Sequence, residues 1–256
     1  MATSQKNPVA LVTGGSRGLG RSMVLHLAER GTDIIFTYRA AESEANDVRE
    51  RVRTLGRKAV ALPLDVTNAA SFDAFGTAVA TELERTFGRK QFDYLVNNAG
   101  TSLHASIAET TDSQLDEVYN VHFKAPFLLT QRLLPLIADG GRIVNISSGL
   151  ARMTLPGSSA YGAMKAAVET LTRYMAKEFG DRKITANVIA PGAIATDFSG
   201  GMVRDNPEVN KRVASMTALG RVGQPDDVGG AVAMLLAPES RWINAQRIEV
   251  SGGMGL

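Results

Sequence analysis

Short apolar stretches alternate along the chain with longer segments in which apolar residues recur every three or four positions. The short stretches are nearly continuous in their apolar character, which is typical of strands buried on both faces. The longer segments have the periodicity of amphipathic helices. The predicted strands are 9–13, 33–38, 59–64, 92–96, 142–146, 184–189 and 247–250, and the predicted helices are 20–30, 41–55, 71–87, 112–137, 160–179 and 226–236.

This alternation predicts an α/β fold, a doubly wound parallel sheet of about seven strands with helices on both faces. The 256 residues are expected to form a single domain, because α/β proteins of this length often do. Pro63 places the third strand at an edge of the sheet, and Pro126 predicts a bend in the long helix 112–137. Ligands of such sheets bind at the carboxyl ends of the strands, near the switch in strand order.

Composition narrows the class of protein. Apolar residues make up 44% of the chain, which excludes wholesale disorder. A net charge of +2 without a Lys/Arg block argues against nucleic-acid binding. The absence of cysteine excludes disulfides and thiolate sites, and three histidines make a histidine-rich metal centre improbable, so no metal is expected.

The first residues, MATSQKNP, lack the apolar core of a signal peptide. The longest apolar runs fall far short of the ~20 residues that span a bilayer. We therefore expect a cytoplasmic protein that does not enter membranes.

A glycine-rich turn follows the first strand, in the sequence TGGSRGLG. Gly14, Gly18 and Gly20 are spaced G-x-x-x-G-x-G and open the first helix. Glycine allows positive φ and close approach of the backbone to a pyrophosphate, and the helix N-terminus offers unpaired N–H groups to the anion. The turn indicates a dinucleotide site.

The same residues fit a second motif. Gly14 to Gly18 match G-x-S-x-G, in which Ser16 is the nucleophile of an α/β-hydrolase. That motif requires upstream strands to supply part of the oxyanion hole, and the residues before it suffice for one strand. The hydrolase is therefore the weaker hypothesis.

The end of the second strand indicates which dinucleotide is bound. NAD sites place an acidic residue there to bind the ribose hydroxyls, whereas this chain has Tyr38-Arg39. Arg17 in the glycine turn adds a second guanidinium, and guanidinium groups suit the 2′-phosphate of NADP(H). The cofactor prediction is NADP(H).

A candidate reacting group follows the fifth strand. Tyr161 and Lys165 are four residues apart and share a helix face, and Ser148 ends the strand before them. A neighbouring ammonium is expected to lower the pKa of the phenol and allow acid–base catalysis nearer neutral pH. The Ser148 hydroxyl is placed to hold a carbonyl oxygen.

These motifs together resemble the short-chain dehydrogenase/reductase family, with its Rossmann-type fold, over about residues 8–253. Asn97-Asn-Ala-Gly100 and Pro191-Gly192 occur in the family's order, and the 3-oxoacyl-[acyl-carrier-protein] reductases look most similar. The resemblance implies that Tyr161 protonates the substrate oxygen, Lys165 holds the nicotinamide ribose and Ser148 orients the carbonyl. It implies a cofactor site of Gly14, Ser16, Arg17, Gly18, Leu19, Gly20, Tyr38, Arg39, Asp65, Val66, Asn98, Ala99, Gly100, Tyr161, Lys165, Pro191, Gly192, Ile194 and Thr196, with Asn97 also lining the cleft.

One residue departs from the family pattern. The family usually places an asparagine five residues before a phenylalanine of the long helix, where it supports a water that relays protons to the lysine. Counting back from Phe127 reaches His122. A histidine has a reference pKa of about 6.5, so His122 is a candidate for passing protons itself. The alternative is a tolerated replacement without effect.

The substrate side is expected at residues 152–158 and in a mobile lid around residues 193–217. A carrier-protein substrate would favour a basic mouth, to which Arg182 and Lys183 are candidates, although Asp139 opposes them. By analogy with the family we expect a homotetramer. The predicted function is NADPH-dependent reduction of a small-molecule carbonyl, 3-oxoacyl or other ketone, and the alternative is a non-catalytic NADP(H) sensor of the same fold.

Overall fold

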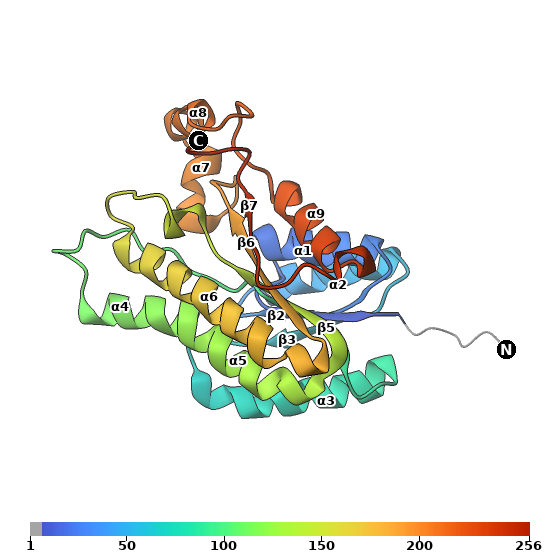
Figure 1. Ribbon diagram of the computed structural model, residues 1–256. Helices are drawn as coiled ribbons and strands as arrows, with labels where there is room; N and C mark the ends of the chain where they lie inside the picture. Colours follow the sequence, from blue (N-terminus) through green and yellow to red (C-terminus); the bar gives the residue numbers. More distant parts are fainter. Residues whose placement is uncertain (1–6) are drawn as a thin grey trace.

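The computed structural model describes residues 7–256, which contain one seven-stranded sheet between two layers of helices (Figure 1). All neighbouring strands are parallel, in the order β3-β2-β1-β4-β5-β6-β7. This confirms the predicted doubly wound sheet. The strands are β1 (Val9–Val12), β2 (Asp33–Tyr38), β3 (Ala59–Pro63), β4 (Phe92–Asn97), β5 (Ile137–Ile146), β6 (Thr185–Pro191) and β7 (Arg247–Val250).

Helices cover both faces of this sheet (Figure 1). One layer holds α1 (Gly18–Glu29), α2 (Glu42–Thr54) and α9 (Pro225–Leu235), and the other holds α3 (Phe72–Phe87), α4 (Asp112–Tyr119), α5 (Ala125–Leu133) and α6 (Ser159–Glu178). The short helices α7 (Met202–Asp205) and α8 (Pro207–Ser215) stand outside these layers, beside the C-terminus.

Strand β1 is apolar throughout because it serves two cores. In β1, Val9 and Leu11 pack into the layer with α3 and α5, while Ala10 and Val12 pack into the layer with α1 and α9. All four side chains are at most 1% exposed. Successive strand residues point to opposite faces, so a central strand of this sheet has no polar side.

The third strand lies at an edge of the sheet, as Pro63 predicts. Pro63 is the last residue of β3 and pairs with Tyr38 of β2. Proline donates no backbone hydrogen bond, and the outer side of an edge strand requires none.

The predicted long helix 112–137 is interrupted, and its break comes before Pro126. Residues 120–124 form a wider π-helical turn between α4 and α5, in which the Ala125 N–H donates to the Asn120 carbonyl, five residues back. Proline at 126 has no N–H to donate to His122 and its ring crowds that carbonyl, so the regular pattern cannot continue there. The wider turn buries both Val121 and His122.

The predicted end of that helix, at residue 137, and the predicted start of the fifth strand, at residue 142, are both too late. The helical residues end at Leu136, and β5 begins at Ile137, five positions before the predicted strand. Pro135 removes a helical donor, and Ile137 already pairs with Phe92 of β4.

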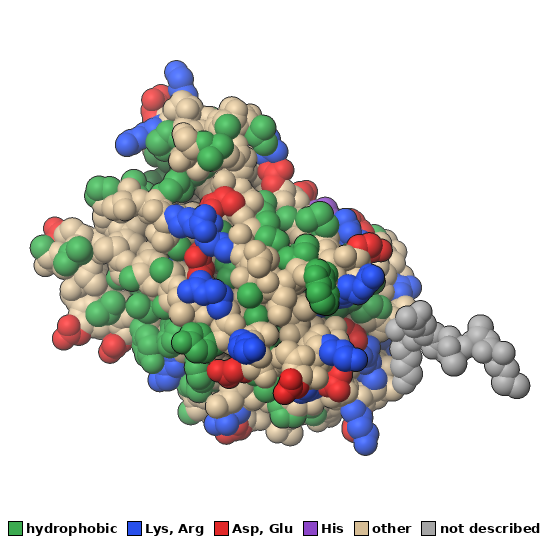
Figure 2. All heavy atoms as spheres, in the orientation of Figure 1, with side chains coloured by type: hydrophobic (Ala, Val, Ile, Leu, Met, Phe, Trp, Pro, Cys, Tyr) green, Lys and Arg blue, Asp and Glu red, His purple; other side chains and the backbone are tan. Residues whose placement is uncertain are grey.

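The described surface agrees with the small net charge. On the face shown in Figure 2, Lys and Arg side chains alternate with Asp and Glu side chains. None of the helices within residues 7–256 has an apolar stretch of bilayer-spanning length. No group of three or more His, Asp or Glu side chains in the same range is arranged to hold a metal ion.

Two adjacent glycines of α9 test how closely the helices pack. A Cβ at Gly229 would lie 2.3 Å from Ser22 Oγ and 2.9 Å from the Ser22 carbonyl carbon, whereas a Cβ at Gly230 would meet nothing within 4 Å. We expect Gly229→Ala to lower the free energy of unfolding by about 1–3 kcal/mol through overpacking. Gly230→Ala is expected to raise it by about 0.5–1 kcal/mol, because alanine favours the helix. Urea unfolding measures both, and similar losses in the two variants would contradict the packing account.

Candidate active site

The glycine turn after β1 is held in place by the neighbouring strand β4. The Asn98 amide nitrogen donates to the carbonyls of Thr13 (2.9 Å) and Gly14 (3.2 Å). In return, the Thr13 hydroxyl accepts the N–H groups of Asn98 (2.9 Å) and Ala99 (3.0 Å). The predicted residues Asn98 and Ala99 thus lie at the point where the strand order switches, and Asn98 braces the turn.

The spacing of the glycines follows from this tight turn. Gly14 and Gly18 have φ of 68° and 53°, values that favour glycine. A Cβ at Gly20 would lie 2.0 Å from the Gly14 carbonyl oxygen and 2.6 Å from the Asn98 amide nitrogen, so no side chain fits there. Helix α1 starts at Gly18 without a side-chain cap and without an acidic residue in its first turn. Its N-terminus is suited to an anion.

The two arginines predicted to bind a phosphate are exposed beside this turn. Arg17 lies in the turn and Arg39 directly after β2, and neither forms an ion pair with a carboxylate among residues 7–256. Asp65 follows β3, and hydrogen bonds from the Thr67 N–H (2.9 Å) and hydroxyl (2.8 Å) hold its carboxylate. The Thr67 N–H, with help from the nearby Arg39, lowers the pKa of Asp65.

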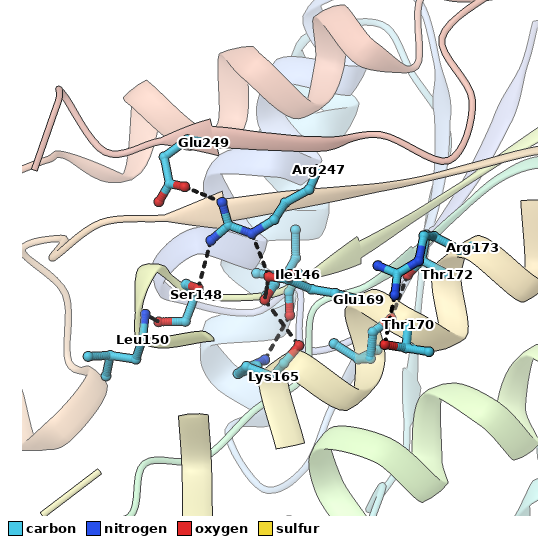
Figure 3. Close-up of polar contacts among 12 residues, drawn as sticks. Ile146, Ser148, Leu150, Lys165, Glu169, Thr170, Thr172, Arg173, Arg247 and Glu249 are labelled. Carbon is cyan, nitrogen blue, oxygen red and sulfur yellow. Dashed lines mark hydrogen bonds and ion pairs between the residues drawn. The ribbon is translucent and has the colours of Figure 1, made fainter. Parts of the chain in front are cut away.

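Ser148, Tyr161 and Lys165 come together at the carboxyl end of β5, and Figure 3 shows Ser148 and Lys165 there. Ser148 follows the strand, and its hydroxyl lies near enough to the Tyr161 phenol to act on the pKa of that phenol. Tyr161 and Lys165 occupy successive turns of α6 and are only 9% and 5% exposed. Lys165 Nζ donates to the Ile146 carbonyl (2.7 Å) and lies 5.5 Å from the centre of the Tyr161 ring.

Burial shifts the pKa values of the tyrosine and the lysine in opposite directions. It raises the pKa of Tyr161 to about 12, against a smaller lowering by the Ser148 hydroxyl. It lowers the pKa of Lys165 to about 7. The prediction that Lys165 lowers the phenol pKa is therefore wrong for the polypeptide itself. The amine bonds to Ile146, lies beside the ring, and is driven toward its neutral form by the same burial.

His122 faces this pair from the π-helical turn. Its ring meets the Tyr161 ring edge-on, with the centroids 5.0 Å apart, and is 2% exposed. Nε2 lies 2.8 Å from the Thr101 carbonyl, so Nε2 carries the hydrogen and Nδ1 is an acceptor. Nδ1 is buried without a hydrogen-bond partner among residues 7–256. Burial, with Lys165 nearby, lowers the pKa of His122 to about 2, so the ring does not pass protons as a cation.

The remaining predicted residues lie at the same end of the sheet. Pro191, Gly192, Ile194 and Thr196 end or follow β6, and the Thr196 side chain lies 3.8 Å from where a Cβ of Gly18 would be. A Cβ at Gly100 would lie 3.1 Å from the His122 ring, so Gly100 packs closely against that ring. Ser16 follows β1, Leu19 lies in the first turn of α1, Tyr38 ends β2 and Val66 follows β3.

Asn97 and Ser16 have surroundings that the sequence does not predict. The Asn97 side chain lines a small cavity with Thr13, Val66 and Ala99, and its amide donates to Asn145 (2.8 Å) and Thr130 (3.2 Å). Ser16 is 8% exposed, and no histidine among residues 7–256 hydrogen-bonds to it, which removes the hydrolase motif. Asn97 is the last residue of β4, and successive side chains of a strand point to opposite faces of the sheet.

The sequence analysis missed one aromatic side chain near the site. The Phe198 ring lies 6.1 Å from the Tyr161 ring and is 43% exposed. Phe198 belongs to the segment predicted as a lid. Its neighbours Ser199, Gly200 and Gly201 all have positive φ. The run of small residues after Phe198 indicated a bend, but nothing in it gave the direction of the ring.

Comparisons with known proteins cover nearly the whole chain. A family model described as enoyl-(acyl carrier protein) reductase matches residues 14–255. The hydroxynaphthalene reductase-like protein Arp2 of Metarhizium brunneum is 37% identical over 270 residues, which cover 99% of each chain. The likeness therefore extends well beyond the glycine turn.

Two solved structures share this fold in detail. The promiscuous reductase LugOII, which catalyses keto-reduction at C1 during lugdunomycin biosynthesis, is 37% identical with a TM-score of 0.92, and the match covers 98% of each chain. The angucycline C-6 ketoreductase LanV with bound NADP is 32% identical with a TM-score of 0.92, covering 97% of this chain and 95% of that one.

Proposed function

Because the chain belongs to the short-chain dehydrogenase/reductase family, we propose that it reduces a ketone with NADPH and that Tyr161 gives the substrate oxygen its proton. The protein is an NADP(H)-dependent oxidoreductase acting on C=O and CH–OH groups. The placement of the Ser148 hydroxyl beside a buried Tyr161 phenol and a buried Lys165 supports the proposed mechanism.

Each side chain of the crevice has a task in this mechanism. When bound, NADPH supplies a hydride to the carbonyl carbon. Ser148 donates a hydrogen bond that orients the carbonyl oxygen, and the Tyr161 phenol donates its proton to that oxygen. A pKa of about 12 keeps the phenol protonated at neutral pH, which suits reduction. Lys165 uses one N–H for Ile146 and keeps at least one more for the ribose hydroxyls of the cofactor.

Substitution of Tyr161 tests the proposed activity. We expect Tyr161→Phe to lower kcat for ketone reduction by about 10²- to 10⁴-fold, because the general acid is lost, and to leave NADPH binding unchanged. NADPH absorbance with a panel of tetralones, acetoacetyl thioesters and small ketones measures turnover, and fluorescence titration measures binding. Tyr174→Phe, 63% exposed on the same helix, is the matched control. Binding of NADPH by the native protein without oxidation across the panel would favour the sensor.

The two exposed arginines are proposed to select NADPH over NADH. Arg17 and Arg39 flank the glycine turn without carboxylate partners in the described chain, so both are free to bind a 2′-phosphate. The proposed site thus combines an uncapped helix N-terminus for the pyrophosphate with two guanidinium groups for the added phosphate.

Charge reversal at Arg39 tests this selection. We expect Arg39→Asp to weaken NADPH binding by about 10- to 150-fold, the range for one charge-assisted hydrogen bond, and to leave NADH binding unchanged or improved. Arg49→Asp makes the same charge change at an exposed position of α2 and is the control. Titration of both nucleotides gives the ratio, and equal losses for NADPH and NADH would refute the phosphate contact.

For the substrate we propose a flat apolar ketone in preference to a 3-oxoacyl carrier protein. Exposed apolar side chains occupy both predicted border segments, with Leu155 on one and Phe198, Met202 and Met216 on the other. Arg182, a candidate for a basic mouth, pairs with Asp139 (2.8 Å) just before β6 begins, at the end of the sheet away from Tyr161. The relatives named for hydroxynaphthalene and angucycline reduction support the same class.

Two further expectations of the sequence analysis remain proposals. Residues 193–217 are proposed to close over the substrate, with Ser199 to Gly201 as the hinge, because three consecutive positive φ values mark a bend. The assembly is proposed to be a homotetramer. Partly or fully exposed side chains, Leu115, Tyr119 and Phe127, recur on one face of α4 and α5, and light scattering would measure the mass.

His122 is proposed to hold a water for Lys165. Its Nδ1 is a buried acceptor without a partner in the described chain, and buried acceptors of this kind are usually satisfied by ordered water. Lys165 lies close enough to lower the pKa of the ring, and its ammonium has donors to spare. A water between them would connect the lysine to solvent.

Two substitutions separate an acceptor from a titrating histidine. With a pKa of about 2, the ring is neutral from pH 5 to 9. His122→Asn removes no titrating group and keeps an acceptor, so we expect its pH profile of kcat to superimpose on the native profile. His122→Leu loses the acceptor and is expected to lower kcat about 10-fold or more, the low end for proton-transfer groups. A native limb near pH 6.5 that is absent from His122→Asn would contradict the neutral ring.

A further inference from the structure

Three charged side chains lie close to Ser148 and Lys165 (Figure 3). Arg247 and Glu249 come from β7, and Glu169 comes from α6. The side chains of Arg247 and Glu169 are only 10% and 13% exposed, and that of Glu249 is 37% exposed. None of these residues is part of the proposed acid–base group.

Arg247 connects three parts of the fold at one guanidinium. Its Nε donates to Glu169 (2.6 Å), its Nη1 donates to Glu249, and its Nη2 donates to the Ser148 carbonyl (3.3 Å). Ser147 joins the same group, because its hydroxyl lies 2.6 Å from Glu169 Oε1 and 3.2 Å from the Lys165 carbonyl. The peptide that carries Ser148 is thus bonded to strand β7, 99 positions later in the chain.

The position of Glu169 on α6 extends the catalytic face. Tyr161, Lys165 and Glu169 are spaced four residues apart, so they lie one above another on the same side of the helix. The bond between Arg247 and Glu169 therefore fixes the helix turn directly after Lys165. The same guanidinium fixes the peptide that presents the Ser148 hydroxyl to Tyr161.

Stability alone gives little reason to keep this group. Desolvation of a buried ion pair can outweigh its attraction, so such pairs are weak stabilisers compared with apolar residues. Orientation gives a stronger reason, because a misplacement of about 1 Å in a catalytic site can cost about 10² in rate. Ser148 is held by its own short turn on one side, through the bond from the Leu150 N–H (3.2 Å), and by Arg247 on the other.

We propose that Arg247, held by Glu169 and Glu249, is a positioning residue that fixes Ser148 relative to Tyr161 and Lys165. We call the contacts of Arg247 with Glu169, Glu249 and the Ser148 carbonyl the clamp. The clamp rests on the structure alone, whereas its expected effect on the rate rests on the proposed function. Arg247 is not among the residues proposed to hold the substrate or the cofactor. It acts by limiting the motion of the peptide between β5 and α6.

Five variants, Arg247→Lys among them, test the clamp. Arg247→Met and Glu169→Gln each remove one partner, and the double variant removes both. Arg173→Met is the matched control, because Arg173 is an exposed arginine of α6 that bonds to Thr170 (3.0 Å) and not to the catalytic segment. The readouts are kcat and KM for the ketone, NADPH affinity, and amide hydrogen exchange of residues 147–151.

We expect Arg247→Met to lower kcat by about 10- to 100-fold with NADPH affinity unchanged, and to speed exchange of residues 147–151. The double variant is expected to lose no more than Arg247→Met, because the two side chains act as one unit. Arg247→Lys keeps the charge but loses the fork of donors, so its kcat is expected to lie between those of the native protein and Arg247→Met. This variant tests the proposal if Arg247→Met folds poorly. Arg173→Met is expected to match the native protein in every readout.

Native kcat and native exchange in Arg247→Met and Glu169→Gln would overturn the proposal. Additive losses in the double variant, or equal losses in kcat and NADPH affinity, would also overturn it, since they indicate general destabilisation. If the native protein reduces no ketone, the proposed function fails, and the exchange of residues 147–151 still decides whether the clamp exists.

Discussion

The joint burial of Tyr161 and Lys165 is the constraint on which the site depends. Neither group is paired with a charge that would keep it ionised, so burial favours the neutral phenol and the neutral amine. The phenol therefore carries a proton at neutral pH, as an acid for reduction requires. The amine, with a pKa of about 7, exchanges its proton close to the pH at which it works. The residues around these two groups have to be held rigidly, because bulk water admitted by their motion would abolish the pKa shifts of Tyr161 and Lys165.

The surroundings of the site are held in place by contacts between parts of the chain that are distant in sequence. The Asn98 side chain and the Thr13 hydroxyl tie the ends of β4 and β1 together, which fixes the glycine turn. Arg247 ties the last strand to the end of β5 and to α6. In both places a side chain bonds to backbone carbonyls, which do not change their protonation or rotamer. The residues that react can then sit on elements whose positions are already determined.

The sequence predicts the parts of this molecule whose signal is local. The strand at residues 33–38 has the same bounds in the structure, because its apolar run is long and its neighbours are polar. The glycine spacing and the four-residue step from Tyr161 to Lys165 are also local, and the structure has both at the carboxyl end of the sheet, where the sequence predicts them. The wide turn at residues 120–124 is different, since proline predicts a bend without stating on which side the extra residue will go. The pKa values were mispredicted for a related reason. Burial comes from every surrounding element, whereas the sequence showed only the adjacent ammonium.

Chemistry and substrate choice are separated in this fold, and the separation follows from its construction. The proposed reacting groups lie directly after β5, on α6 and in the turn before α5. The apolar side chains proposed to border the substrate lie on segments outside the two helix layers, at Leu155 and from Phe198 to Met216. Consecutive positive φ values at Ser199, Gly200 and Gly201 place a bend near the start of the second segment. Changes in the outer segments are therefore expected to alter which ketone is held without moving Tyr161. Changes at β7, although far from the substrate, act on the phenol's partner Ser148.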